Sequence, residues 1–259
     1  MGRLEGQIAV IIGGSSGMGR ATGLTFAEEG ARVVISAPWR AEIEEVAAEI
    51  EKRGGEAVAC VADVTKRSEV DYAVRTAVTR YGRLDVLANF AGVNISNRQL
   101  TSLDQAGWDH VIGVNLTGAL NCTQAVLPQM REQKGGLIIH IASISGIWGD
   151  LSGAAYQASK HGMVGLANAT MMEERLNGIR VTVIYPGLCD TAILSNWAIP
   201  PTNEQRALMM KPEDIAQACL FVATLPSRTY VSDLTIMPGA LQCNGNSVAH
   251  AIVMSGRIP

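Results

Sequence analysis

Seven short runs rich in valine and isoleucine recur along the chain, and longer amphipathic segments separate them. The runs are largely apolar rather than alternating, which is typical of strands buried on both faces of a parallel sheet. The expected strands are Ile8–Ile12, Arg32–Ser36, Ala57–Val61, Val86–Asn89, Leu137–Ala142, Arg180–Tyr185 and Leu234–Met237. The expected helices are Met18–Glu29, Glu42–Arg53, Lys66–Tyr81, Trp108–Gln133, Ala155–Asn177 and Pro212–Ala223. This alternation predicts an α/β fold in which helices cover both faces of the sheet.

No linker, repeat or change of composition divides the 259 residues, so we expect a single domain, residues 1–259. Gly30 and Gly54 follow charged segments and are expected to end helices. The stretch 187–211 has no clear pattern and is too long for an ordinary connection, so we expect a lid or substrate loop. For the tail Leu241–Pro259 we expect either packing on a neighbouring subunit or partial disorder.

The composition argues against several classes of protein. The net charge of −3 and the lack of a Lys/Arg run argue against a nucleic-acid partner. No apolar stretch approaches the ~20 residues that span a bilayer, and the N-terminus lacks the order of a signal peptide. The five cysteines are scattered and form no Cys-x-x-Cys pair, which suits a reducing compartment and argues against a metal site. We therefore expect a cytoplasmic protein with no membrane association and no bound metal.

The first expected strand leads into the loop Gly13-Gly14-Ser15-Ser16-Gly17-Met18-Gly19 and then into a helix. Such glycines allow a tight turn and let the backbone approach a pyrophosphate, which the free N–H groups of the helix N-terminus bind. The residues expected to contact a dinucleotide here are Gly13, Ser15, Ser16, Gly17, Met18 and Gly19. The spacing Gly-x-x-x-Gly-x-Gly differs from the Gly-x-Gly-x-x-Gly of other dinucleotide folds, so a plain glycine-rich turn is the alternative.

A second motif pairs Tyr156 with Lys160, one turn apart on the same face of an expected helix. A free tyrosine has a pKa of about 10, and a nearby ammonium lowers that pKa toward the range useful for proton transfer. Taken alone, an exposed Tyr–Lys surface pair explains the spacing better. Ser143 changes this balance, because it follows an expected strand at the sheet edge where α/β folds bind ligands. Its neighbour Ser145 has the alternative of a loop hydroxyl that stabilises a turn.

Five segments together resemble the classical short-chain dehydrogenases/reductases in order and spacing, over the chain to about Gly239. They are the glycine loop, Asp63-Val64, Asn89-Phe90-Ala91-Gly92, Ser143 with Tyr156-x-x-x-Lys160, and Pro186-Gly187 with Thr191. The resemblance implies a Rossmann-like, doubly wound sheet of seven parallel strands in a three-layer α/β/α arrangement. It also implies an enzyme that moves a hydride between a nicotinamide cofactor and a carbonyl or alcohol.

The resemblance implies four catalytic residues. Tyr156 would be the general acid/base, and Lys160 would lower its pKa and hold the nicotinamide ribose. Ser143 would position the substrate oxygen. Asn115 would hold a water in a proton relay to Lys160; its alternative is a helix asparagine bonded to its own backbone.

The resemblance also implies the rest of the cofactor site. Asp63 would accept a hydrogen bond from the adenine amino group, with Val64 packed on the ring; the alternative for Asp63 is an N-cap of the helix near Lys66. The remaining cofactor contacts would come from Asn89, Ala91 and Gly92 along the ribose, Thr191 at the carboxamide, and Pro186 and Gly187.

The chain departs from the family at two strand ends. Ile12 stands where threonine is usual, and Phe90 stands where a second asparagine is usual. We expect the double loss to be nearly neutral, because neither polar group leaves an unpaired buried partner behind. Near the C-terminus, Tyr230 to Pro238 looks more like the branch containing NADP-dependent hydroxy-acid and serine dehydrogenases.

The choice between NAD and NADP depends on the residue that ends the second strand, where an acid would bind the 2′-hydroxyl of NAD. The chain has Ala37 there and Pro38 next, so neither usual determinant is present. Arg40 is close enough in sequence to meet a 2′-phosphate, and Trp39 is placed to cover the adenine. We expect NADP as the preferred cofactor and NAD as the alternative, with a solvated surface charge as the other interpretation of Arg40.

The expected substrate wall is mostly apolar and consists of Asn94, Ser143, Ser145, Trp148, Leu188, Leu194 and Trp197. It suits a small ketone, keto acid or keto ester and the corresponding secondary alcohol. Arg98 and Arg206 would clamp a carboxylate only if their loops fold inward, so a hydroxy-acid or serine-type NADP dehydrogenase is the alternative.

Two further classes fit the sequence less well. A lyase or epimerase of the extended relatives would need a longer chain, and a non-catalytic cofactor-binding protein would be expected to lose one of Ser143, Tyr156 and Lys160. Family members usually form tetramers through the helices expected at 108–133 and 155–177 and through the last strand. We therefore expect a homotetramer or a homodimer.

Overall fold

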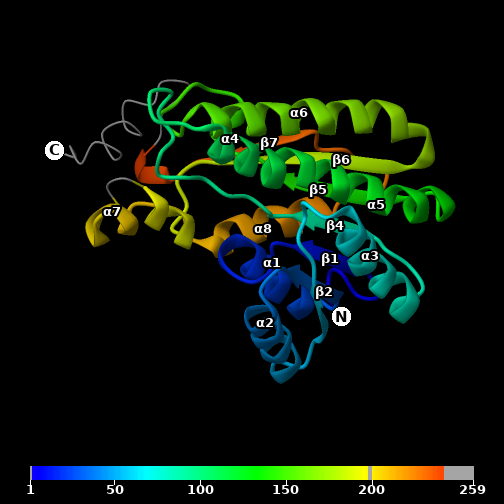
Figure 1. Ribbon diagram of the computed structural model, residues 1–259. Coiled ribbons are helices and arrows are strands. Elements are labelled where there is room, and N and C mark those ends of the chain that lie inside the picture. Colours follow the sequence, from blue (N-terminus) through cyan, green and yellow to red (C-terminus); the bar gives the residue numbers. More distant parts are fainter. Residues whose placement is uncertain (1, 198–199, 242–259) are drawn as a thin grey trace.

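The computed structural model describes residues 2–197 and 200–241, so the expected tail lies outside the described residues from position 242 onward. Within the described part, seven parallel strands form one sheet in the order β3-β2-β1-β4-β5-β6-β7 (Figure 1). All seven expected strands are present: β1 (Ile8–Ile12), β2 (Arg32–Ala37), β3 (Glu56–Val61), β4 (Val86–Asn89), β5 (Gly136–Ile141), β6 (Ile179–Pro186) and β7 (Asp233–Ile236). The strand order reverses at β1, and ligands of open α/β sheets bind at the carboxyl ends beside such a reversal.

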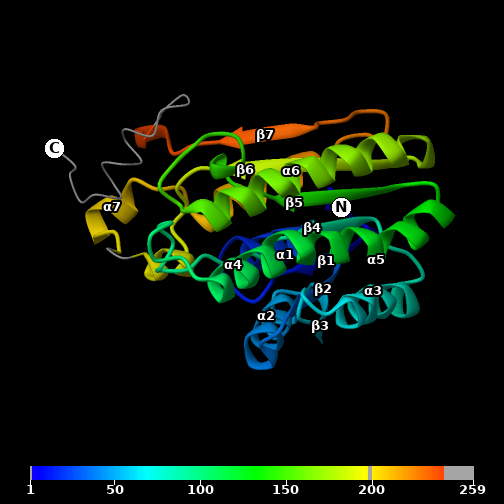
Figure 2. The same cartoon turned by 45° about the horizontal axis from the view of Figure 1, so that its top comes forward.

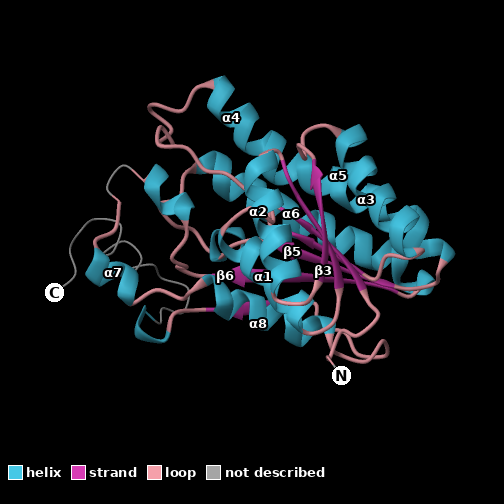
Figure 3. Ribbon diagram, turned by 90° about the horizontal axis from the view of Figure 1, so that it is seen from below, coloured by secondary structure: helices cyan, strands magenta, loops and turns pink. Residues whose placement is uncertain are grey.

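Helices cover both faces of this sheet (Figures 1 and 2). Three of them share one apolar core with the sheet: α1 (Gly17–Glu28), α2 (Arg40–Lys52) and α8 (Pro212–Ala223). Three others share the second core: α3 (Arg67–Tyr81), α5 (Gly118–Glu132) and α6 (Ala154–Glu174). The arrangement is the expected three-layer α/β/α fold, and Figure 3 shows the twisted strands among these helices.

The burial of β1 explains why the sequence runs are apolar rather than alternating. All five residues from Ile8 to Ile12 are buried, with successive side chains entering the two cores in turn. A strand in the middle of a covered parallel sheet has no solvent face, and each fully buried Ile side chain contributes about 1.5–3 kcal/mol.

The two unusual strand ends lie side by side. The Phe90 N–H donates to the Ile12 carbonyl at 2.8 Å, while the two side chains pack into cores on opposite faces of the sheet. The backbone therefore ties these strand ends together, without a polar side-chain pair.

The helix expected at 108–133 is interrupted. It consists of α4 (Gln105–Ile112), a π-helical segment Gly113–Thr117, and α5. A π segment places one extra residue in a turn and leaves the composition unchanged, so the sequence pattern does not reveal it. The glycines expected to end helices do so, with Gly30 at φ +90° and Gly54 at φ +86°.

The stretch 187–211 is an excursion whose two ends meet. Asp190 N–H donates to the Met210 carbonyl at 2.8 Å, and the Asp190 carboxylate pairs with Arg206 at 2.6 Å. Between these ends lie a 3₁₀ turn, Ala192–Asn196, and the short helix α7 (Asn203–Ala207). Figure 1 shows this segment, in yellow, projecting beyond one end of the sheet.

Candidate active site

The glycine loop makes a tight turn from β1 into α1. Gly13 has φ +75°, and a Cβ at this position would lie 2.8 Å from the Ala91 backbone nitrogen. A Cβ on Gly19 would overlap the Gly13 carbonyl oxygen. Ser16 occupies the N-cap position of α1, but its side chain makes no hydrogen bond to the helix. The first amides of α1 therefore point out of the turn without a side-chain partner. This arrangement of free N–H groups at a positive helix end suits a pyrophosphate.

A cleft of about 530 Å³ runs along the carboxyl ends of the central strands. Most of the expected cofactor residues line it: Gly13, Ser15, Ser16, Gly17, Met18, Gly19, Asp63, Val64, Ala91, Gly92, Tyr156, Lys160 and Thr191. The size, the tight glycine turn and the uncapped helix end together fit a dinucleotide.

Helix α6 presents Tyr156 and Lys160 to this cleft from its first two turns. The helix starts after Gly153, whose φ of +95° requires glycine, and Lys160 is buried. The Lys160 Nζ donates to the Ile141 carbonyl at 2.8 Å and lies 5.6 Å from the centre of the Tyr156 ring. The pair is therefore part of an interior site, and the alternative of an exposed surface pair is wrong.

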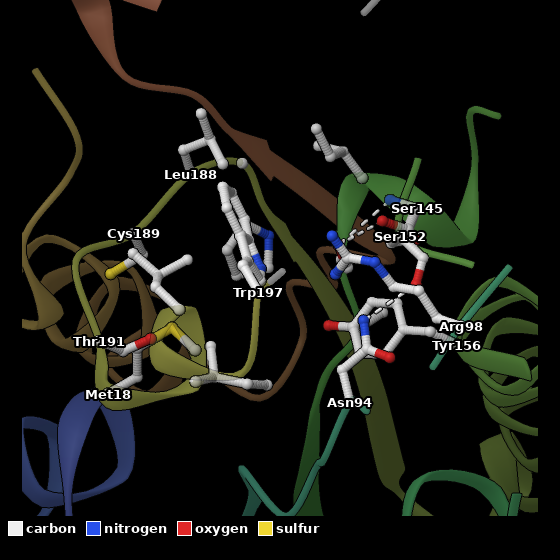
Figure 4. Close-up of a pocket in the computed structure, with 17 residues that line it drawn as sticks. Met18, Asn94, Arg98, Ser145, Ser152, Tyr156, Leu188, Cys189, Thr191 and Trp197 are labelled. Atoms are coloured by element: carbon white, nitrogen blue, oxygen red, sulfur yellow. Dashed lines mark hydrogen bonds between the residues drawn. The ribbon is translucent and has the colours of Figure 1, made fainter. Parts of the chain in front are cut away.

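A smaller pocket of about 110 Å³ adjoins the cleft (Figure 4). Five residues line both spaces: Met18, Ala142, Tyr156, Thr191 and Ile193. Tyr156 thus lies on the wall shared by a dinucleotide-sized cleft and a pocket for a small molecule, next to Ser143 at the end of β5.

Comparison with known proteins gives the family. A family model for short chain dehydrogenases matches residues 7–200. The chain belongs to the short-chain dehydrogenases/reductases. Over 241 residues it is 36% identical to the 3-oxoacyl-[acyl-carrier-protein] reductase FabG of Thermotoga maritima, covering 90% of this chain and 96% of the relative. Over 238 residues it is 35% identical to the 3-oxoacyl-[acyl-carrier-protein] reductase of Synechocystis, covering 91% and 96%.

Solved structures agree with this family. A metagenomic short-chain oxidoreductase in complex with NADP superposes with a TM-score of 0.79 at 31% identity, covering 91% of this chain and 98% of the other. Levodione reductase superposes with a TM-score of 0.82 at 28% identity, with the same coverage. The short-chain dehydrogenase/reductase described here is accordingly an NAD(P)-dependent oxidoreductase that acts on CH–OH and C=O groups.

Protonation in the enzyme's site is dominated by burial. Burial raises the pKa of Tyr156 to about 12, and the hydrogen bond with the Ser143 side chain opposes this rise. Burial lowers the pKa of Lys160 to about 8. The expected lowering of the tyrosine pKa by Lys160 is not seen in this arrangement, where the ammonium is bonded to a backbone carbonyl instead.

Ser143 belongs to a chain of hydroxyl groups. Its Oγ donates to the Ser145 Oγ at 3.1 Å and accepts from the Ser145 N–H at 3.1 Å. Ser145 in turn donates to the Asp150 carboxylate, which also accepts from the Ser152 N–H at 2.8 Å. Ser145 therefore lines the pocket and also stabilises the turn, so both interpretations of this residue hold in part.

Asn115 is completely buried in the π-helical segment. Its Oδ1 accepts from the Val93 N–H at 2.7 Å, and its Nδ2 donates to the Val93 carbonyl and the Ser159 Oγ, both at 3.0 Å. It thus bonds to neighbouring elements, not to its own helix backbone. A Cβ added to Gly92 would lie 3.6 Å from Asn115 Oδ1 and 3.4 Å from Lys160 Nζ, so both groups face the same small space.

Four expected cofactor residues do not line the cleft. The Asn89 side chain is buried behind it, where Oδ1 accepts from the Ala91 N–H and Nδ2 bonds with His140. Arg40 is exposed and pairs with Glu44 at 3.1 Å, as the solvated-charge interpretation predicts. Pro186 and Gly187 line the smaller pocket instead. They lie at the carboxyl end of β6, which neighbours β5 on the side of the sheet away from β1.

Asp63 lines the cleft but does not cap a helix. Its Oδ1 accepts from the Thr65 N–H at 2.9 Å and the Thr65 hydroxyl at 2.8 Å, which closes an Asx turn. The N-cap of α3 is Lys66. The capping alternative is therefore wrong.

The smaller pocket contains six of the seven expected substrate residues: Asn94, Ser143, Ser145, Leu188, Leu194 and Trp197. Trp148 is the exception. It follows the 3₁₀ turn Ile144–Gly146 and packs against the core under α6, because the turn rotates the chain away from the pocket.

Sequence reasoning did not name Ser152 or His140, and it left open whether Arg98 faces the site. Arg98 and Ser152 line the pocket, although the loop that carries Arg98 has no pattern that fixes its direction. His140 lies fully buried in β5, and the signal was a histidine inside an otherwise apolar strand. Arg206, the other candidate clamp, is held by Asp190 and does not line the pocket.

Two general features concern the described residues, 2–197 and 200–241. No cluster of three or more His, Cys, Asp or Glu side chains there is placed to hold a metal ion. No helix in the same part of the chain is long and apolar enough to cross a membrane.

Proposed function

We propose that this enzyme reduces a small ketone to a secondary alcohol, with Tyr156 as the proton donor and NADPH as the preferred hydride donor. The observation that carries the proposal is the position of Tyr156 on the wall between the 530 Å³ cleft and the 110 Å³ pocket. A proton donor at that wall reaches a carbonyl oxygen in the pocket while the carbonyl carbon faces the cleft. The names of the two reductase relatives agree with a ketone substrate.

The protonation states of Tyr156 and Lys160 favour reduction of a ketone over oxidation of an alcohol. With a pKa of about 12, Tyr156 carries its proton at neutral pH and is ready to donate it to a carbonyl oxygen. Ser143 would donate a second hydrogen bond to the same oxygen once its contact with Ser145 gives way. Lys160, with a pKa of about 8, is largely charged at neutral pH and would stabilise the phenolate left after proton donation.

A bound nicotinamide dinucleotide would supply the hydride, and this chain's residues would hold it. The glycine loop and the N-terminus of α1 would bind the pyrophosphate. Asp63 and Val64 would flank the adenine. Lys160 would hold the ribose next to the nicotinamide, and Thr191 would face the carboxamide.

The preference for NADP rests on the end of β2. Ala37, Pro38 and Trp39 line the cleft there, and none of them carries a carboxylate that would repel a 2′-phosphate. Trp39 occupies the N-cap position of α2, and its side chain makes no hydrogen bond to the helix. The first amides of α2 would therefore be free to bind the phosphate. This replaces the role first expected of Arg40. Comparing kcat/KM for NADPH and NADH tests the proposal: we expect NADPH to be favoured about tenfold or more, and a clear NADH preference would contradict it.

Replacing Tyr156 with phenylalanine tests the proton donor. The variant keeps the ring and loses the hydroxyl, so kcat for ketone reduction should fall by about 10²–10⁴-fold while NADPH still binds. NADPH oxidation followed by absorbance measures the rate, and fluorescence titration measures cofactor binding. Tyr72→Phe, at an exposed tyrosine of α3, is the matched control. Full activity in Tyr156→Phe would disprove the proposed role.

A further inference from the structure

Arg98 enters the smaller pocket from the loop between β4 and α4. Figure 4 shows its side chain extending between Trp197 on one side and Ser145, Ser152 and Tyr156 on the other. The guanidinium carbon lies 5.8 Å from the centre of the Trp197 ring. Among the described residues that line this pocket, Arg98 alone has a side chain that is charged at neutral pH. The described lining contains no Asp, Glu, Lys or His.

The backbone around Arg98 is held against the start of α6. The Asn94 Nδ2 donates to the Ser152 carbonyl at 2.9 Å, and both residues are buried. A Cβ on Gly153 would lie 2.6 Å from the Arg98 Cβ and 2.8 Å from its carbonyl oxygen, so glycine lets the two segments touch. Tyr156 follows Gly153 by three positions, and this contact therefore fixes the distance between the arginine and the proposed proton donor.

The guanidinium has unmet hydrogen-bonding capacity. Its Nη1 is buried and has no hydrogen-bond partner. Burial lowers the pKa of Arg98, and the charge of Asp150 opposes that change. Burying donors of a cation without acceptors is costly, and an anion in the pocket would remove that cost.

The surroundings favour one negative charge. Asp150 lies behind the pocket wall, where its carboxylate accepts hydrogen bonds from Ser145 and Ser152. Its charge offsets part of the positive potential of Arg98, which suits a monoanion better than a phosphate dianion. The pocket volume of about 110 Å³ also suits a compact group. A guanidinium binds the planar carboxylate with two parallel hydrogen bonds.

We infer that the substrate is a small oxo acid whose carboxylate pairs with Arg98 while its carbonyl faces Ser143 and Tyr156. This inference rests on the proposed function and names its substrate class. In the step, the carbonyl carbon would gain the hydride that the bound dinucleotide supplies and the oxygen would gain the Tyr156 proton, which gives a hydroxy acid. The Tyr156 phenolate would then recover its proton from solvent. The apolar side chains of Leu188 and Leu194 line the same pocket and would contact the remaining carbon atoms.

The test uses oxo acids paired with their methyl esters. Acetoacetate, 2-oxopentanoate and 4-oxopentanoate are each compared with the ester, which keeps the ketone and removes the charge. For the best pair we expect wild-type kcat/KM to favour the acid. In Arg98→Met it should fall on the order of 100-fold for the acid, mainly through KM, and little for the ester. Arg98→Lys, which keeps the charge but loses the paired geometry, should lie between the two.

Arg206→Met is the matched control, since Arg206 lies in the neighbouring excursion and is paired with Asp190 outside the pocket. It should leave the acid-to-ester ratio unchanged. If wild type prefers the ester in every pair, or if Arg98→Met slows acid and ester equally, the inference is overturned.

A binding measurement separates failure of this inference from failure of the proposed function. Titration calorimetry of the NADP⁺-loaded enzyme compares isovalerate with isovaleramide, neither of which can be reduced at a ketone. Selective binding of the acid that is lost in Arg98→Met supports the anion site even if no ketone is turned over. Equal binding of acid and amide overturns the anion site even if neutral ketones are reduced.

Discussion

At the scale of single residues, His140 is held neutral in the middle of the sheet. Thr123 donates its one hydroxyl hydrogen to the Ala119 carbonyl at 2.9 Å, so the imidazole must donate its Nε2–H to Thr123, at 3.1 Å. The Nδ1 then accepts from Asn89. Asn89 uses its other polar atom on the Ala91 N–H, which shapes the cleft wall. A buried neutral histidine thereby orients the turn that follows β4.

This histidine makes stability depend on pH. Burial and the nearby Lys160 charge lower the pKa of His140 from 6.5 to about 4. Between these values the unfolded chain binds a proton that the folded chain does not, so stability falls as pH drops from about 6.5 to about 4 and is unaffected above. The loss amounts to about 3 kcal/mol. Urea unfolding at pH 7 and pH 4.5 should show this loss in wild type and a smaller one in His140→Asn. His161→Asn, at an exposed histidine of α6, should behave as wild type; equal pH dependence in all three proteins would refute the assignment.

Residue-scale predictions from sequence succeeded where a backbone motif fixes the side chain. Tyr156 and Lys160 share a helix face, and the glycine loop needs glycines for its turn, so both could be placed without coordinates. Trp148 and Arg98 could not, because each follows a turn whose direction depends on contacts distant in sequence. For Arg98 the deciding contact is Gly153, 55 positions further along the chain.

At the scale of elements, the π-helical segment Gly113–Thr117 links three parts of the fold through Asn115. Its bonds join this segment to Val93, after β4, and to Ser159 in α6.

The strands and most helices were predictable because burial on two faces and amphipathic periodicity leave distinct patterns. The π segment was not predictable, because one extra residue in a turn shifts the face of the helix without changing its composition.

Asn115→Leu tests this link. The substitution keeps the approximate volume and leaves the Val93 N–H, the Val93 carbonyl and the Ser159 hydroxyl without their partner. We expect the free energy of unfolding to fall by about 3 kcal/mol, measured by urea denaturation. The control is Asn168→Leu, at an exposed position of α6. A loss no larger in Asn115→Leu than in this control would show that the bonds of Asn115 do not stabilise the junction.

At the scale of the whole molecule, α5 and α6 run side by side on the outside of the sheet (Figure 2). Met172 in α6 is 54% exposed, and Leu176, in the turn after it, is 86% exposed. Exposed apolar side chains of this size are candidates for a subunit interface. At the end of the sheet, β7 pairs only with β6 among the described strands, so its outer edge is open to pairing with another chain.

These features predict that the enzyme assembles through the α5–α6 face. Light scattering should give about four times the 27.4 kDa mass of one chain, or twice that mass if only one interface forms. Changing both Met172 and Leu176 to glutamate places two carboxylates in the interface, where their desolvation is costly, so the mass should fall while the circular dichroism spectrum stays the same. Tyr72→Glu is the control, because Tyr72 is 57% exposed on α3, outside α5 and α6. If the double variant keeps the wild-type mass, the α5–α6 face does not hold the assembly together; if the wild type has the mass of one chain, assembly itself is disproved.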